Sequence, residues 1–258
     1  MTITTAEPRS ASRPSRRHRT LAASAVAGAV ALSLSLGVGA AQAGTAGTLS
    51  AGHVDTGFVA LQTGSYKLTL GSNVDDNPSY ADAYYTRGQV NATAAHNTPA
   101  YDFEVNSGAK HGSVWVIQDN LPDADADDAI FAGFAGAAED KSQGSTRVAR
   151  SLFAGGKIGA DDHLIYKVNV DSGSAGTVGL DFSTAQANGE DVTSTGSSGA
   201  GYTVTFGLGN ADDEEAFHVH PKWTFSAAGD YWIKVVASTD ASGVTQSDPT
   251  YYHFHVDA

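Results

Sequence analysis

Past the first 43 residues, short runs of hydrophobic residues alternate with polar ones in a period of two. This alternation is typical of β-strands with one buried face, and no window keeps an apolar period of 3.6 residues over three helical turns. Clusters of Gly, Ser, Asp and Asn bound the runs and predict turns. The predicted strands cover residues 65–72, 113–118, 163–170, 176–183, 202–208, 216–227, 230–238 and 250–257.

Strands at this spacing predict an all-β fold, an antiparallel β-sandwich built from residues 44–258 as one sandwich or two packed sub-sandwiches. The turn before Gly229-Asp230-Tyr231 is similar to the tyrosine corner of immunoglobulin-like sandwiches, in which a tyrosine hydroxyl bonds back to the preceding backbone. We therefore expect an immunoglobulin-like C-terminal part. A helix or turn is predicted at residues 139–153, and loops at 75–85, 122–128 and 185–200.

Residues 1–43 have the layout of a secretory signal peptide, with a basic start, an apolar stretch over residues 21–38 and Ala41-Gln42-Ala43 as the cleavage signature. Arg16-Arg17 lacks the hydrophobic pair that follows the arginines of a twin-arginine signal, which favours the general secretory route and leaves the twin-arginine route as the alternative. No later segment is apolar for long enough to span a bilayer. We expect a secreted or cell-envelope-associated protein without a transmembrane anchor in residues 44–258.

Charge and composition exclude several classes of function. Five of the 15 basic residues and one of the 28 acidic residues lie in the first 43 positions, so residues 44–258 carry a net charge of −17. Such a charge repels phosphate backbones, which excludes nucleic acid as a partner. The chain has no cysteine, which excludes thiol catalysis and cysteine-ligated zinc. No hydrolase, metalloprotease, phosphate-loop or dinucleotide motif occurs, so we expect no enzymatic activity.

Two His-x-His motifs, His218/His220 and His253/His255, stand in predicted strands. On a strand, residues i and i+2 point to the same face about 6.5–7 Å apart, so two imidazoles can converge on one ion at about 2.0–2.1 Å per nitrogen. Both pairs lie opposite the apolar face of their strand. A solvated outer face carrying histidines without a ligand is the alternative interpretation.

A complete site needs further ligands, and the segment LSAGHVDTGF offers His53 and Asp55, again two residues apart. The alternative is a strand start at which Asp55 caps a turn. We predict a metal site formed by His53, Asp55, His218 and His220, with His253 and His255 as a second candidate pair. Neutral imidazoles suit zinc, copper, nickel or iron, and a carboxylate admits manganese, so the identity of the ion stays open.

An acidic segment around residues 121–134 is similar to a calcium-binding loop. Asp123, Asp125 and Asp127 occupy the first, third and fifth positions of an EF-hand pattern, but Asp128 and Phe134 stand where a glycine and a glutamate are required. A solvated acidic turn is the favoured interpretation, and weak calcium binding is the alternative.

Three segments, in the order LSAGHVDTGF, GSVWVIQDNLPDADADDAIFAGF and FHVHPKWTFSAAGDYWIKVVAS, resemble actinobacterial surface-anchored proteins with a choice-of-anchor M domain. The last segment resembles the wall-associated H-x-H-x-x-W-x-F repeat of that family, and the resemblance spans about residues 47–256. It implies an exported protein that handles a transition-metal ion, such as zinc or manganese. The implied partners are components of an ABC-type metal transporter or cell-envelope proteins.

Two departures from the family pattern are visible: its C-terminal anchor has no counterpart here, and the second histidine pair is not part of it. A structural or adhesive surface domain is the alternative function. Such a domain would present aromatic residues such as Tyr80, Tyr84 and Tyr85 to glycan or protein, with histidines that bind no metal.

Overall fold

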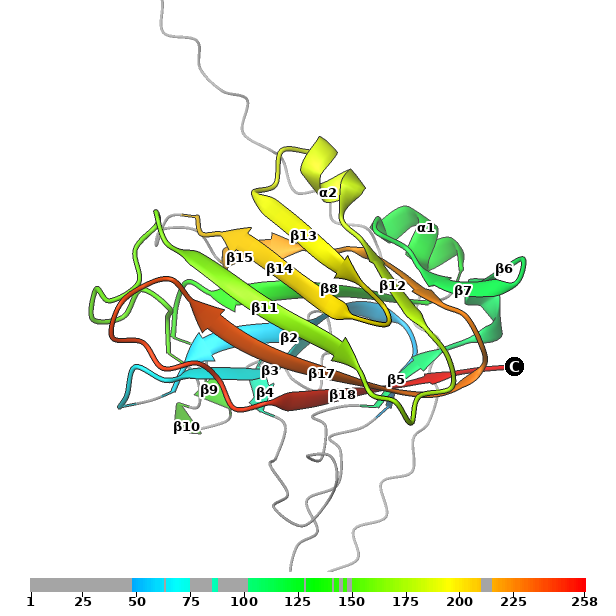
Figure 1. Ribbon diagram of the computed structural model, residues 1–258, viewed down its shortest axis with the longest axis horizontal. Helices are drawn as coiled ribbons and strands as arrows, with labels where there is room; N and C mark the ends of the chain where they lie inside the picture. Colours follow the sequence, from blue (N-terminus) through cyan, green and yellow to red (C-terminus); the bar gives the residue numbers. More distant parts are fainter. Residues whose placement is uncertain are drawn as a thin grey trace, which may run out of the picture. The chain divides into compact units, whose positions relative to one another are not determined.

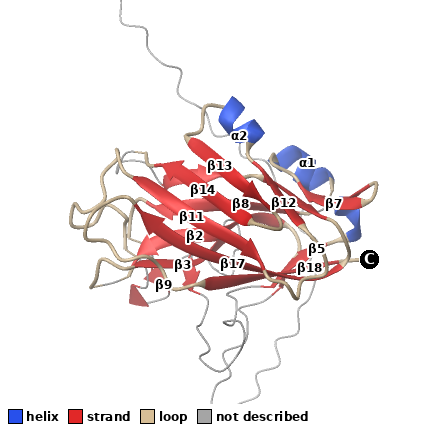
Figure 2. Cartoon of the chain, viewed as in Figure 1, coloured by secondary structure: helices blue, strands red, loops and turns tan. Residues whose placement is uncertain are grey.

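Strands dominate the part of the chain that the structure describes (Figure 2). The structure is a computed structural model that describes residues 48–62, 64–74, 85–87, 102–127, 129–140, 142–143, 146–147, 150–209 and 215–258. All of these residues belong to one unit, Gln42–Ala258. The all-β class predicted from the alternation is confirmed. The predicted signal peptide lies outside the described residues.

Three larger sheets and one two-stranded ribbon make up this unit. The seven-stranded sheet has the order β1 (Thr48–Leu49), β5 (Asp102–Val105), β18 (Thr250–Val256), β17 (Gly229–Thr239), β11 (His163–Val170), β14 (Gly201–Gly207) and β13 (Val192–Ser197). The five-stranded sheet has the order β15 (Glu215–Val219), β8 (Ile130–Ala137), β2 (Gly52–Leu61), β3 (Leu68–Val74) and β4 (Tyr85–Arg87). The four-stranded sheet has the order β12 (Val178–Asp181), β16 (Lys222–Phe225), β7 (Val114–Ile117) and β6 (Lys110–His111), and the ribbon pairs β9 (Ser142–Gln143) with β10 (Thr146–Arg147).

The core lies between the seven-stranded sheet and the two sheets behind it, so the arrangement is sandwich-like (Figure 1). Two buried tyrosines join the layers: Tyr166 of β11 donates to the carbonyl of Gly57 at 3.0 Å, and Tyr252 of β18 donates to that of Gly71 at 2.9 Å. Large aromatic side chains from all three sheets fill the space between, among them Phe134, Tyr166, Phe206, Trp223, Phe225 and Phe254. Buried aromatic residues of this size dominate the energetics of a core.

Most neighbouring strands run antiparallel, in line with the predicted antiparallel sandwich, but the sheets are mixed. The pairs β1·β5, β5·β18 and β2·β8 are parallel. Alternation along one strand shows which residues are buried and not the direction of the neighbour, so the sequence pattern could not reveal these pairs. An immunoglobulin-like order for the C-terminal strands stays a prediction.

The helices are short and stand where loops were expected. Helix α1 (Leu121–Ala126) occupies most of the predicted loop at 122–128, and α2 (Ser183–Ala187) begins just before the predicted loop at 185–200, which also contains β13. A single 3-10 turn, η2, covers Ser107–Ala109. The described part of the helix or turn predicted at 139–153 contains β9, β10 and a turn that begins at Leu152, so the turn is confirmed and the helix is not. No helix among the described residues is long and apolar enough to cross a membrane.

The tyrosine corner predicted at Tyr231 is confirmed as a local contact. The backbone N–H of Ala227 donates to the Tyr231 hydroxyl at 3.0 Å, and that hydroxyl donates to the Ala227 carbonyl at 2.7 Å. The contact fixes the turn between β16 and β17 and gives Tyr231 a structural role.

Candidate metal centre

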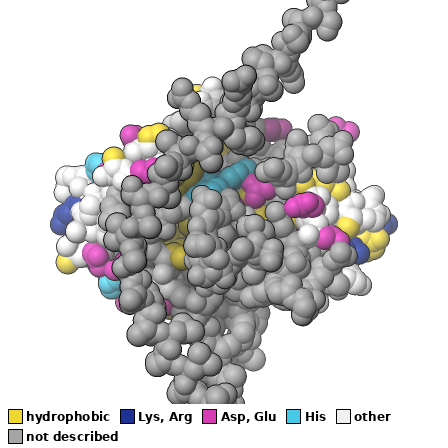
Figure 3. Space-filling model, turned by 180° about the vertical axis from the view of Figure 1, so that it is seen from behind, with side chains coloured by type: hydrophobic (Ala, Val, Ile, Leu, Met, Phe, Trp, Pro, Cys, Tyr) yellow, Lys and Arg dark blue, Asp and Glu magenta, His cyan; other side chains and the backbone are white. Residues whose placement is uncertain are grey.

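Strand β8 forms the floor of a histidine-rich site on the outer face of the five-stranded sheet. The inner residues of β8, such as Ala132 and Phe134, belong to the main core, whereas Ala135 and Ala137 belong to a separate buried cluster. Figure 3, which views the molecule from behind Figure 1, shows histidine side chains gathered near the middle of this face beside acidic ones.

The pairing around β8 places four functional side chains on one face. On one side, β2 runs parallel to β8 and pairs His53 with Phe131 and Asp55 with Gly133. On the other side, β15 runs antiparallel and pairs His218 with Ala135. Paired residues point to the same face of a sheet, so side chains from both neighbouring strands converge above β8.

A β-bulge in β2 lies directly after Asp55. Asp55 pairs with Gly133 and Gly57 with Phe134, so Thr56 is an extra residue that has no counterpart in the strand pairing with β8. The Thr56 hydroxyl donates to the Gly133 carbonyl at 3.0 Å, which fixes the irregular segment to the neighbouring strand. The extra residue keeps Phe58 on the same face as Asp55, although the two are three positions apart. Bulges of this kind commonly lie beside functional sites.

His220, which follows the end of β15, is held by two residues of β8. Its ring stacks on Phe131 with centroids 3.7 Å apart and planes within 5°. The same ring lies over Gly133, where an added Cβ would come within 2.6 Å of ring atoms. A side chain at position 133 would therefore displace the imidazole, and glycine is needed there for space.

These contacts bring the four predicted ligands together as one group, called here the tetrad: His53, Asp55, His218 and His220. The three Nε2 atoms form a triangle with sides of 3.1 Å (His53–His218), 2.9 Å (His53–His220) and 2.8 Å (His218–His220). Asp55 Oδ1 lies 3.0 Å from His218 Nε2, 3.9 Å from His53 Nε2 and 3.8 Å from His220 Nε2.

Asp55 is the most buried member of the tetrad and carries an unsatisfied oxygen. Its side chain is 1% exposed, and Asn73 Nδ2 donates to its Oδ2 at 3.1 Å. Its Oδ1 faces the three histidines and lies 3.0 Å from His218 Nε2, but the two atoms are not aligned well for a hydrogen bond. A buried carboxylate oxygen without a partner costs free energy that a cation in the site would offset.

The pKa values of the tetrad diverge because the groups share one buried space. Burial would lower the pKa of His218, but the contacts with Asp55 and Glu215 outweigh it and raise that pKa to about 10. Burial and the charges of the other two histidines lower the pKa of His220 to about 3. Burial would raise the pKa of Asp55, but the contact with His218 and the histidine charges hold it below the usual 3.8.

Three imidazoles and one carboxylate are a suitable donor set for a divalent transition-metal ion. Four ligand atoms placed at about 2.0–2.1 Å around a tetrahedral ion lie about 3.3–3.4 Å from one another. The six distances within the tetrad run from 2.8 to 3.9 Å and bracket that value. The tetrad is the one group of this kind among the residues that the structure describes.

Two residues contact the ligand side chains and help to orient them, although the sequence patterns did not indicate either one. Glu215 Oε2 lies 2.8 Å from His218 Nδ1, and Asn73 donates to Asp55. Metal-binding histidines commonly give their second ring nitrogen to a carboxylate, and metal-binding carboxylates are themselves hydrogen-bonded. Glu215 stands three residues before His218, a spacing that on a regular strand predicts opposite faces. Asn73 lies on a different strand, so no local signal marked either residue.

The second candidate pair, His253 and His255, contacts carboxylates from neighbouring strands. His253 Nδ1 lies 2.8 Å from Asp102 Oδ1 and its Nε2 lies 3.2 Å from Asp230 Oδ1, while His255 Nδ1 lies 2.7 Å from the same Asp230 oxygen. The His253 ring also stacks on Trp232 with centroids 4.4 Å apart. Asp230 Oδ1 thus lies between the two imidazoles, and the pair forms a surface ion-pair network on β17, β18 and β5.

The other sequence candidates lie apart from the tetrad. Asp123 belongs to the first turn of α1, where its backbone N–H is capped by Asn120 at 3.0 Å, and Asp127 contacts His111 at 2.9 Å. Asp123 and Asp127 therefore have separate partners, and residues 121–126 form a short, mostly exposed helix. Tyr80 and Tyr84 lie outside the described residues, and Tyr85 is described only as the first residue of β4.

Comparison of the chain with protein-family models, with curated proteins and with solved structures gave no significant match. The resemblance to choice-of-anchor M proteins therefore stays a prediction. The chemistry of the site rests on its own geometry.

Proposed function

We propose that this protein binds a divalent transition-metal ion through His53, Asp55, His218 and His220. The observation that carries the proposal is the convergence of three Nε2 atoms and one buried, unsatisfied carboxylate oxygen within 3.9 Å of one another. Protons could bridge these four atoms only two at a time. A single cation accepts a lone pair from all four atoms at once.

The four protein ligands are typical of a site that binds an ion and not of one that uses the ion in catalysis. Catalytic zinc sites keep three protein ligands and leave one position open for water, whereas four protein ligands fill a tetrahedral shell. Zinc fits the three imidazoles, and the carboxylate also admits manganese. We propose a binding protein and no enzymatic activity.

The place of this function in the cell is a further part of the proposal. The signal-peptide pattern in residues 1–43 and the resemblance to envelope-linked proteins support export. A protein exported with this centre would capture or carry metal outside the cytoplasm and pass it to an ABC-type uptake system or to envelope partners.

The experiment is metal analysis of the purified protein, followed by calorimetric titration of the metal-stripped protein with Zn²⁺ and with Mn²⁺. We expect one ion per chain in the wild type and none in His218→Ala. His163→Ala is the matched control, because His163 is an exposed histidine that contacts Asp240 at 2.9 Å, away from the tetrad. A wild type that neither retains nor binds either ion would remove the proposal and favour the structural or adhesive alternative.

A further inference from the structure

Strand β15 contains a bulge that changes the direction in which Glu215 points. Glu215 pairs with Ala137 and Phe217 pairs with Gly136, so Ala216 is an extra residue without a partner on β8. On a regular strand, Glu215 and His218 would point to opposite faces, because they are three positions apart. Because Ala216 is an extra residue, Glu215 lies on the same outer face of the sheet as His218.

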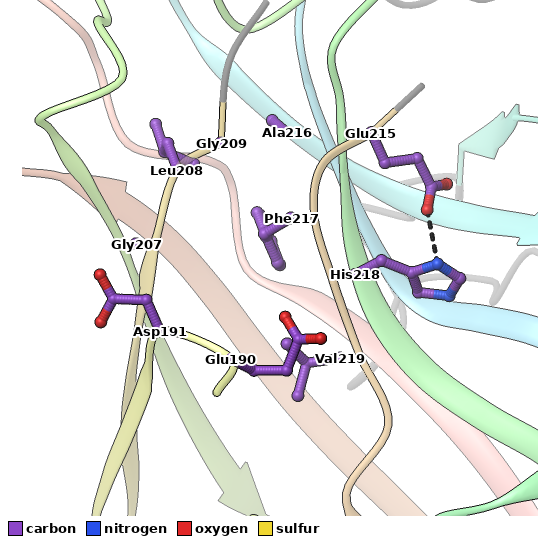
Figure 4. A pocket seen from close by; sticks show the side chains of 10 residues that line it. All are labelled: Glu190, Asp191, Gly207, Leu208, Gly209, Glu215, Ala216, Phe217, His218 and Val219. Atoms are coloured by element: carbon purple, nitrogen blue, oxygen red, sulfur yellow. Dashed lines mark ion pairs between the residues drawn. The ribbon is translucent and has the colours of Figure 1, made fainter. Parts of the chain in front are cut away.

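Figure 4 shows the result of this bulge. Glu215 and His218 lie on one side of the strand and are joined by an ion pair of 2.8 Å, whereas Phe217 and Val219 lie on the other side. The cavity on that other side, about 330 Å³ in volume, is lined in part by Glu190 and Phe217. Glu215 and His218 also border this cavity, but the ion pair of the Glu215 carboxylate is with His218 Nδ1, whose ring carries the Nε2 atom of the tetrad.

His218 is the member of the tetrad that most needs an orienting partner. Its side chain is 35% exposed, compared with 17% for His53 and 8% for His220. It lies on β15, an edge strand that pairs only with β8 in its sheet. His220 is held by its stack on Phe131, whereas the described contacts of the His218 ring are with the other members of the tetrad and, at Nδ1, with Glu215.

We propose that Glu215 is a positioning residue that sets how tightly and for how long the centre holds its ion. Its Oε2 accepts the Nδ1 proton of His218, which selects the tautomer whose Nε2 lone pair faces the ion and holds the ring in place. The negative charge also makes the imidazole a stronger donor. This inference rests on the proposed function, because it concerns the affinity of the same site.

The test compares wild type with Glu215→Ala, Glu215→Gln and the control Glu190→Gln, which changes an acidic residue that lines the cavity from the segment before β13. Zn²⁺ affinity is measured by competition with a chelator, and the release rate by transfer to an excess of that chelator. We expect Glu215→Ala to weaken binding by about 10–100-fold, mainly through faster release. Glu215→Gln keeps an oxygen acceptor without the charge and should show an intermediate loss, while Glu190→Gln should match wild type.

Replacing Zn²⁺ by Co²⁺ allows the geometry of the site to be followed by visible absorption, which a general loss of stability would not change. The visible absorption of bound Co²⁺ should shift in Glu215→Ala and return towards the wild-type spectrum in Glu215→Gln. If Glu215→Ala does not fold, Glu215→Gln decides. Wild-type affinity, release rate and spectrum in the folded Glu215 variants would overturn this inference alone, whereas a wild type without metal binding would overturn the proposed function and this inference with it.

Discussion

The two His-x-His motifs have the same spacing and both stand at an outer sheet face, yet their surroundings differ. His218 and His220 lie over a strand of small residues, Gly133 and Ala135, and face a further histidine and a buried carboxylate. His253 and His255 instead have a carboxylate close to each ring, and a tryptophan covers the first. The comparison teaches that the neighbouring strands decide whether such a pair is a ligand set, because they either leave space for an ion or fill it with counter-charges.

Removing one histidine from each pair should give the largest contrast. We expect His220→Ala to weaken Zn²⁺ binding by more than about 100-fold, since losing a ligand should cost more than losing a residue that only supports one. His253→Ala should leave the affinity unchanged. Calorimetric titration of both variants checks this, and equal losses in the two would refute the distinction between the pairs.

Adding one methyl group beneath the first pair should give the next largest effect. Gly133→Ala places a Cβ within 2.6 Å of the His220 ring, so the imidazole must move away from the centre. We expect an affinity loss of roughly 10–100-fold, similar to other changes that disturb ligand orientation. Gly199→Ala is the matched control, since a Cβ there meets nothing within 4 Å. Wild-type Zn²⁺ affinity in Gly133→Ala would show that the ring does not depend on this space.

The pH dependence of metal binding should follow His218 and not an ordinary histidine. Its pKa is raised to about 10, so the metal-free protein keeps this ring protonated at neutral pH and the ion must displace that proton. Affinity should therefore rise by about tenfold per pH unit from pH 7 to pH 9, beyond the range in which an unperturbed histidine titrates. Calorimetric titrations in buffers of different ionisation enthalpy measure how many protons are released for each ion that binds. An affinity that is flat above pH 7 would contradict this expectation.

The smallest effect is expected at the second pair. Asp230→Asn removes the carboxylate that both His253 and His255 contact, but its side chain is 60% exposed, so the unfolding free energy should fall by less than about 1 kcal/mol. The pKa of Asp230 is lowered and that of His255 is raised, both by their mutual contact. The stabilisation is therefore present between about pH 4 and pH 6.5 and is lost as the pH rises through the folded-state pKa of His255.

Urea unfolding of wild type and Asp230→Asn at pH 5.5 and pH 9 measures that difference. We expect a small loss of stability at pH 5.5, none at pH 9 and no change in Zn²⁺ affinity at either pH. A change in Zn²⁺ affinity would mean that the second pair acts on the centre.

The sequence predicted those strands in which burial alternates, such as residues 163–170 and 230–238, because one face is buried and the other is not. It missed β8, the floor of the site, because Ile130–Ala137 is buried on both faces and rich in Ala and Gly, which gives no alternation. The tetrad itself was predictable, since i and i+2 spacing survives in any strand. That its two halves would meet was not predictable, because strand order is absent from a local pattern.

The residues that support the ligands could not be predicted from the sequence pattern, for a physical reason. Both bulges break the period of two, and a regular strand would place Glu215 and His218 on opposite faces. The space over Gly133 is equally invisible, because a glycine in a strand can mark a bulge, a bend or a close approach.

The centre joins positions that lie 165 residues apart, His53 and His218. An unfolded chain holds these groups far from each other, so it has no high-affinity site until β2 and β15 are both docked on β8. A chain that crosses the membrane unfolded would therefore arrive empty and take its ion from the compartment in which it folds. For an exported chain, the long separation would tie metal loading to the metal supply of the compartment in which the protein folds and not to that of the cytoplasm.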